Sequence, residues 1–218
     1  MEALTKLEAV NHMLLMSGES LVNDLDLESG LDTEVSLFIL ERFITDFQLR
    51  GLANNKYVKT FRLDAEGYVT LPIDTLSAEL ISYHSNSDGY RIKAVARQSS
   101  SGDIILHNVT DNDNQWSANK DYDVELVYSL EWEELDNPVK RAVLAASTRQ
   151  YQLVMQGDAD IDQYLGQVES IYAIKSKASD IDDRNSSAFS SLTPAGKKAL
   201  IREHYNDPSR FRFWRHSS

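Results

Sequence analysis

The 218-residue chain contains no cysteine. Disulfide bonds, thiolate metal sites and cysteine nucleophiles are therefore excluded, because each of them needs a thiol. The absence also suits a protein that is made and used in a reducing cytoplasm. No apolar run approaches the roughly 20 residues that a membrane helix needs. Residues 1–5 lack the basic and then apolar order of a signal peptide, so we expect no membrane contact.

The sequence also has little that supports catalysis. Its five histidines never stand at the four-residue spacing that builds a zinc site on a helix. Asp111, Asp113 and Gln115 alternate as they would in a calcium loop. Trp116 and Tyr122, however, occupy the positions where that loop needs Gly and Glu. We predict neither an enzyme nor a bound cofactor or metal.

Charge is distributed unevenly along the chain. The net charge of the whole protein is −12. Residues 194–218 hold six basic and two acidic residues, a net charge of +4 that leaves −16 on the rest of the chain. An acidic body argues against wrapping nucleic acid, which favours a basic surface, and the basic end suggests a partner of its own.

Four segments carry apolar residues at helical spacing. Each runs from a capping residue to a glycine or to a change in composition: Thr5 to Gly18, Asp32 to Gly51, Asn137 to Gly157, and Asp158 or Asp160 to Asp180. The second has the widest apolar face, which includes Phe38 and Phe43. We therefore expect that helix to be buried on more than one side.

Between the second and third helical segments the period changes to that of strands. Residues 58–62 and 68–71 flank a Gly-containing turn at 64–67, which predicts a β-hairpin. Further strands are expected near residues 80–84, 90–95, 103–107 and 124–128. Several short strands at regular spacing favour an antiparallel sandwich or a small barrel.

The order of segments predicts an α+β fold. Residues 1–54 and 133–180 would form the two halves of a four-helix bundle, because no single amphipathic helix is stable alone. Residues 55–132 would form an inserted antiparallel β-sandwich or barrel-like domain. Residues 181–218 would be an extended C-terminal tail that begins with a Ser-rich linker.

The end of this tail is a candidate docking segment. Aromatic and arginine side chains alternate there: Arg210, Phe211, Arg212, Phe213, Trp214 and Arg215. Such residues dominate the energetics of protein interfaces, and three aromatics are costly to leave in water. We predict that the cluster docks on a partner protein. The alternatives are that it is a solvated end, or that it folds back on its own β domain or bundle.

Several short motifs follow in an order that is typical of one protein family. They are Ala9-Val10-Asn11 with Leu14, Gly18-Glu19 and Val22; Gln48-Leu49-Arg50-Gly51; Leu71-Pro72-Ile73-Asp74; Glu133 to Pro138; Arg141, Ala145, Ala146 and Arg149; and Gly157-Asp158. On these residues the chain resembles, over residues 3–180, the tail tubular protein A family of short-tailed, T7-like bacteriophages. Leu52 and Ala53 depart from the Trp and the aromatic residue that the family usually has there.

The resemblance implies a structural virion protein with a helical bundle and a β domain. Family members form a ring, expected to be a dodecamer, that joins the portal to a tail nozzle of the tail tubular protein B type. Double-stranded DNA would pass through the ring without specific binding, and tail fibres could also make contact. The protein would be assembled in the host cytoplasm and reside in the phage tail.

Two other functions fit the sequence less well. Glu131, Glu133 and Glu134 surround Trp132, as in the acid pair and sugar-stacking aromatic of a carbohydrate-binding or cell-wall-degrading virion module. Glutamates before a helix are more simply explained by the positive end of the helix dipole. The second alternative is a head-completion protein.

Overall fold

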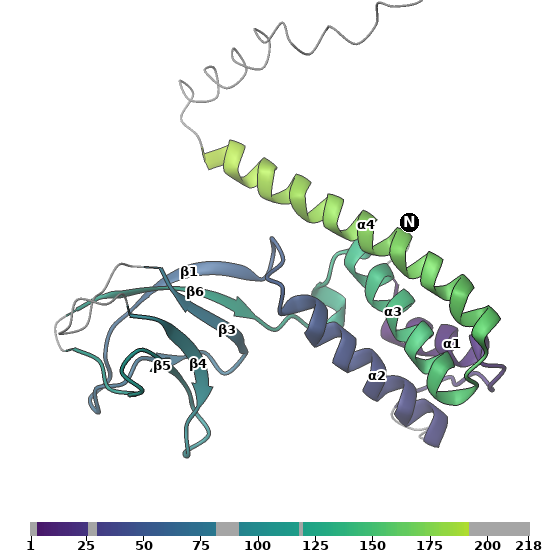
Figure 1. Ribbon diagram of the computed structural model, residues 1–218, viewed down its shortest axis with the longest axis horizontal. Coiled ribbons are helices and arrows are strands. Elements are labelled where there is room, and N and C mark those ends of the chain that lie inside the picture. The colour runs from purple at the N-terminus through teal and green to yellow at the C-terminus, as the bar shows by residue number, and fades with distance from the viewer. Residues whose placement is uncertain (1–3, 26–29, 82–91, 118–119, 192–218) are drawn as a thin grey trace, which may run out of the picture. The chain divides into compact units, whose positions relative to one another are not determined.

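The computed structural model describes residues 4–25, 30–81, 92–117 and 120–191, and only the backbone of residues 185–191. These residues form an α+β fold with four α-helices and two three-stranded antiparallel sheets. The chain divides into two compact units, residues 1–177 and 178–218. The helices are α1 (Lys6–Met16), α2 (Leu31–Gln48), α3 (Asn137–Met155) and α4 (Ala159–Ser191), shown in Figure 1.

The strands fall between α2 and α3 in the sequence. The first sheet has the order β1-β6-β3, and the second has the order β2-β5-β4. Their bounds are β1 (Lys56–Phe61), β2 (Thr70–Leu71), β3 (Thr75–Leu80), β4 (Ala94–Gln98), β5 (Ile104–Asn108) and β6 (Tyr122–Tyr128). The order of elements is therefore the predicted one: two helices, strands, two helices.

The helix ends follow local chemistry. Thr5 caps α1 through a capping box with Glu8, as the sequence predicts. Pro138 stands in the first turn of α3, where its missing N–H leaves no bond unmade. The N-cap of α3 is Asp136 rather than Asn137, and the N-cap of α2 is Gly30 rather than Asp32. The capping residue was wrong in both helices, because several acceptable caps lie next to one another in the sequence.

Helix α4 is longer than predicted. The sequence places a linker from residue 181 onwards, but the helix continues to Ser191. Arg184 pairs with Asp180 one turn earlier at 2.8 Å, and no glycine or proline interrupts residues 167–191. Serine only mildly disfavours a helix, so composition alone misled the prediction. Residues 192–218 lie outside the described part.

The predicted hairpin is wrong, although its turn is correct. The Asp64 carboxylate accepts hydrogen bonds from the N–H groups of Glu66 and Tyr68 at 3.1 and 2.8 Å. The two flanking strands nevertheless join different sheets, because β1 pairs with β6 and β2 pairs with β5. Turn chemistry fixes where the chain bends, but not which strand it pairs with afterwards.

Two hydrophobic cores hold the first unit together. The helical core is formed by α1, α2 and α3 with the segment that precedes α3, and Trp132 is its largest fully buried side chain. The second core is shared by the two sheets and centres on residues such as Leu106, Trp116 and Leu126. Phe43 packs at the edge of the helical core, whereas Phe38 is 69% exposed. The prediction that Phe38 is buried is therefore wrong.

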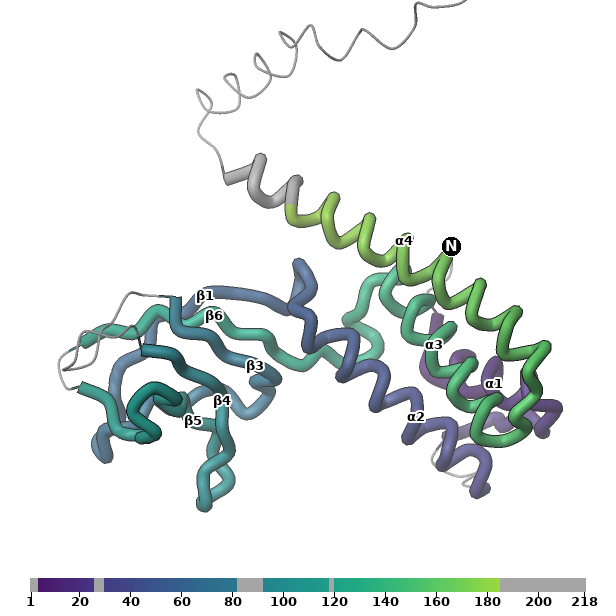
Figure 2. Tube along the Cα trace, viewed as in Figure 1, coloured from purple at the N-terminus to yellow at the C-terminus, as the bar shows by residue number. Residues whose placement is uncertain are grey.

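The chain crosses between these cores twice, after α2 and before α3 (Figure 2). Gln48, fully buried at the end of α2, bonds both backbone groups of Leu130 on the returning segment. Its amide nitrogen donates to the Leu130 carbonyl at 2.9 Å, and its amide oxygen accepts the Leu130 N–H at 2.6 Å. The Gln48 side chain thus makes the two backbone hydrogen bonds that a neighbouring strand would otherwise make.

Asn55 makes the matching contact on the β side. Its amide donates to the carbonyls of Gln48 and Tyr128 at 3.2 and 3.0 Å, and its oxygen accepts the Leu52 N–H at 2.6 Å. The Tyr128 N–H in turn donates to the Asn55 carbonyl at 3.0 Å. Gln48 and Asn55 therefore pair buried backbone groups on both crossings, and we call them the junction amides.

We expect Gln48→Leu to destabilise the protein strongly. The substitution keeps an apolar stem of similar size but leaves the two backbone groups of Leu130 buried and unpaired, which costs about 1–3 kcal/mol for each group. Urea unfolding followed by circular dichroism measures the loss. Gln150→Leu on the exposed surface of α3 is the matched control and should have little effect. Equal stability of the two variants would contradict the role of the junction amides.

Candidate functional site

The docking cluster predicted from the sequence comprises Arg210, Phe211, Arg212, Phe213, Trp214 and Arg215. All six lie outside the described residues. Their role therefore stays a prediction. Other candidate sites and partner surfaces fall within the described helices and loops.

The glutamates around Trp132 serve a structural purpose. The Glu134 carboxylate accepts the Glu131 N–H at 3.0 Å, which closes a short 3-10 helix over residues 132–134. Trp132 is only 2% exposed, and its ring N–H donates to the Leu4 carbonyl at 2.9 Å. A ring buried in the helical core cannot stack on a sugar. The observed contacts therefore remove the feature on which the carbohydrate alternative depends.

The loop with alternating acids is also explained by its own hydrogen bonds. The Asp113 carboxylate accepts the N–H groups of Asn114 and Gln115 at 2.7 and 3.1 Å. The Asp111 carboxylate accepts the Asn108 amide at 2.8 Å. Within the described residues, no group of three His, Asp or Glu side chains is arranged to hold a metal ion.

A groove with a volume of about 400 Å³ runs between α1, α3 and the first part of α4. Its walls are mostly apolar, with Glu8, His12 and Arg141 as the polar contributors. The apolar lining consists of Leu4, Met16, Leu144, Ala145, Tyr164, Leu165, Val168 and Tyr172. Burial in this wall lowers the pKa of His12, because desolvation disfavours the charged imidazolium. The groove therefore offers a partner a largely apolar surface.

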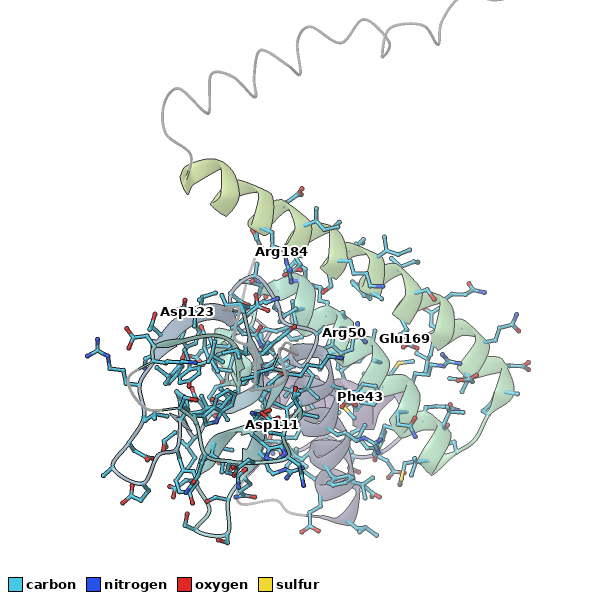
Figure 3. The ribbon with its side chains drawn as sticks, turned by 60° about the vertical axis from the view of Figure 1, so that its left-hand side comes forward. Phe43, Arg50, Asp111, Asp123, Glu169 and Arg184 are labelled. Carbon is cyan, nitrogen blue, oxygen red and sulfur yellow. The ribbon has the colours of Figure 1, made fainter. Side chains whose placement is uncertain are left out.

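Arg149 fastens α4 to α3. Its guanidinium donates to both oxygens of Asp162 at 2.6 and 3.1 Å and to Glu169 at 3.0 Å, so that the Glu169 side chain is directed towards α3 (Figure 3). Hydrogen bonding to Arg149 lowers the pKa of Asp162. The contribution of the pair to stability is thus present above the ordinary pKa of aspartate and is lost as the pH falls through the lowered value.

Gly166 makes room for this arginine. It stands one turn after Asp162 on the same face of α4, and an added Cβ would lie 3.3 Å from the Arg149 guanidinium carbon. The sequence indicated Gly157, which ends α3, but not Gly166. A glycine inside a helix is a signal for close approach that could have been used.

Helices α2 and α4 carry large exposed apolar side chains. Phe38 on α2 and Ile174 on α4 are 69% and 68% exposed, and Ile171 is 51% exposed. The spacing of apolar residues in the sequence predicts a buried face for Phe38. Helical periodicity identifies an apolar face but does not tell whether the protein's own core or another molecule covers it.

No helix in the described ranges is both long and apolar enough to cross a membrane.

Comparison with known proteins identifies one family. A family model described as Tube, Tail tubular protein, matches residues 7–185. This range covers α1 from residue 7, the whole of α2 and α3, α4 up to residue 185, and all the described strands. No curated protein matches the chain.

We expect Gly166→Ala to stabilise the protein far less than a glycine-to-alanine substitution inside a helix normally does. Replacing glycine by alanine inside a helix gains about 1 kcal/mol, but here the new methyl group would lie 3.3 Å from the Arg149 guanidinium carbon and would press against this ion-paired group. In an Arg149→Ala background the full gain should return. Urea unfolding of the four proteins of this double-mutant cycle measures the coupling. The control, Gln167→Ala at an exposed position on α4, should have the same effect in both backgrounds; equal gains for Gly166→Ala would refute the packing argument.

Proposed function

We propose, on the premise that this chain belongs to the tail tubular protein family, that it is the adaptor joining the portal to the tail of a short-tailed phage. The family match over residues 7–185 carries the proposal and confirms the resemblance found in the sequence. It makes the protein a structural component of a phage tail and not an enzyme. The adaptor role, the ring and the individual partners are the proposed part.

In this role, copies of the chain form a closed ring, expected to be a dodecamer, between the portal and a nozzle of the tail tubular protein B type. Residues 1–54 and 133–180 act as a four-helix bundle that carries the inserted β-sandwich domain of residues 55–132. Two separate hydrophobic cores support this division. A ring of this kind needs two different surfaces on each copy, because its contacts close by rotation.

The ring would surround double-stranded DNA without binding it specifically. Residues 1–193 carry a net charge of −16, so the like-charged phosphates are repelled from most of the surface. The protein would be assembled in the host cytoplasm and reside in the phage tail, where tail fibres are expected as further neighbours.

The basic end of the chain would then anchor the ring. Residues 210–215, with three arginines and three aromatics, have the composition of an interface hot spot. We assign this segment to a groove on the portal or on an adjacent subunit. Eighteen residues of sequence separate the end of α4 from Arg210.

The adaptor role predicts assembly on the portal. Light scattering of the two purified proteins should show a complex much larger than either component, because many copies are ordered on one portal ring. Negative-stain images should show a second ring on the portal. Two proteins that stay separate at micromolar concentration would contradict the proposed function.

The anchor role predicts that assembly and folding can be separated. Deleting residues 207–218 should leave the melting temperature nearly unchanged, because these residues come after all the described helices and strands in the sequence. The same deletion should abolish portal binding. Deleting residues 216–218 alone is the matched control and should preserve binding. If the deletion strongly lowers the melting temperature while portal binding persists, these residues belong to the core instead.

A further inference from the structure

Helix α4 presents an exposed apolar face, whose first residue, Tyr164, also lines the groove beside α1 and α3. Tyr164, Ile171 and Ile174 are 60%, 51% and 68% exposed. They stand seven and three residues apart, which aligns them along one side of a helix. The opposite side is packed, with Leu165 and Ser176 each only 4% exposed. We call the exposed set the α4 face.

Two lysines flank this face. Lys175 and Lys177 are the only charged residues between Glu169 and Asp180, so this stretch of α4 carries a charge of +2. The Lys175 ammonium lies 5.3 Å from the centre of the Tyr172 ring. Both lysines are exposed and stand on either side of Ile171 and Ile174 in the helical repeat.

Helix α2 presents a second apolar face with the opposite charge. Leu31 and Phe38 are 74% and 69% exposed and stand seven residues apart, about 10 Å along the helix. Over the whole helix, residues 31–48, four acids stand against one base, a net charge of −3: Asp32, Glu34, Glu41 and Asp46 against the exposed Arg42, which lies one turn after Phe38 and pairs with Asp46 at 3.9 Å. Glu41 also pairs with Lys6 at 2.9 Å, on the surface of its own copy. We call Leu31, Phe38 and these acids the α2 face.

The two faces match each other better than either matches itself. Tyr164 and Ile171 have the same seven-residue spacing as Leu31 and Phe38, so the apolar side chains of two helices can interdigitate. Opposite charges flank the two faces, whereas α4 against α4 would bring lysines together and α2 against α2 would bring acids together. Like charges at an interface suppress the wrong pairing.

We propose that the α4 face of one copy packs on the α2 face of the next copy. This inference rests on the proposed ring and names the surfaces that build it. Within the first unit α3 contacts α2, and its Arg149 binds α4, so that α3 separates the two helices (Figures 1 and 3). One copy can therefore engage a neighbour on each side. Such head-to-tail contacts are the kind that close into a ring.

Cross-linking tests which faces meet, because the natural chain has no cysteine to interfere. Full-length Phe38→Cys and Ile174→Cys proteins are prepared separately, assembled on the portal alone or as a mixture, and treated with a short bismaleimide. Cross-linked dimers are expected in the mixture and not in either variant alone. Phe43→Cys, on the same helix at a half-buried position, replaces Phe38→Cys in the control mixture and should not cross-link.

The outcomes separate this inference from the proposed function. Rings that form without a cross-link in the mixture, or with cross-links in one variant alone, overturn the α4–α2 contact and leave the adaptor role intact. Failure of the unmodified chain to form rings on the portal overturns both. A cross-link that is absent from the full-length mixture and appears only when residues 207–218 are deleted would assign the α4 face to the C-terminal segment and also overturn the inference.

Charge reversal provides a second test. Lys175→Glu with Lys177→Glu should weaken ring formation about tenfold or more, and Glu34→Lys with Glu41→Lys should do the same. The protein that carries all four changes should recover assembly, because the charges are again opposite. Lys59→Glu with Lys93→Glu, at exposed positions outside the helices, is the control. Circular dichroism melts verify folding; the absence of rescue in folded protein would count against the contact.

Discussion

The structure of the first unit depends on how two stretches of backbone are satisfied where they cross between the cores. Neither crossing is part of a helix or a sheet ladder over its whole length, yet Gln48 and Asn55 are fully buried there. Buried backbone groups need hydrogen-bond partners, and the two amides supply them to Leu52, Tyr128 and Leu130. The helical and β parts are thereby held as one unit by polar bonds as well as by apolar packing.

A different set of buried polar groups lies farther along α3. Ser147, Thr148 and Tyr151 on α3 are almost completely buried, and within the described chain their hydroxyl groups have no hydrogen-bond partner. Burial, with the nearby Asp32 and Glu19 charges, raises the pKa of Tyr151 to about 12. Unpaired buried hydroxyls reduce the cohesion of a core.

The sequence predicted most elements but few of their partners. Apolar periodicity located all four helices and most strands, because local spacing determines which face is apolar. It misassigned Phe38, since an exposed apolar side chain on a helix has the same periodicity as one in the core. The bond of Gln48 to Leu130 could not be predicted, because the two residues are 82 positions apart. The role of Arg210 to Arg215 stays a prediction.

The two crossings also lie side by side. The Asn54 amide donates to the Asp136 carboxylate at 3.2 Å, although the whole β part separates them in sequence. An insertion whose ends meet imposes no stretch on its host, and such sites tolerate the loss, gain or exchange of a segment. The strands of residues 56–128 could thus diverge or lengthen over evolution while the helices, with the core residues Leu130 and Trp132, kept their arrangement.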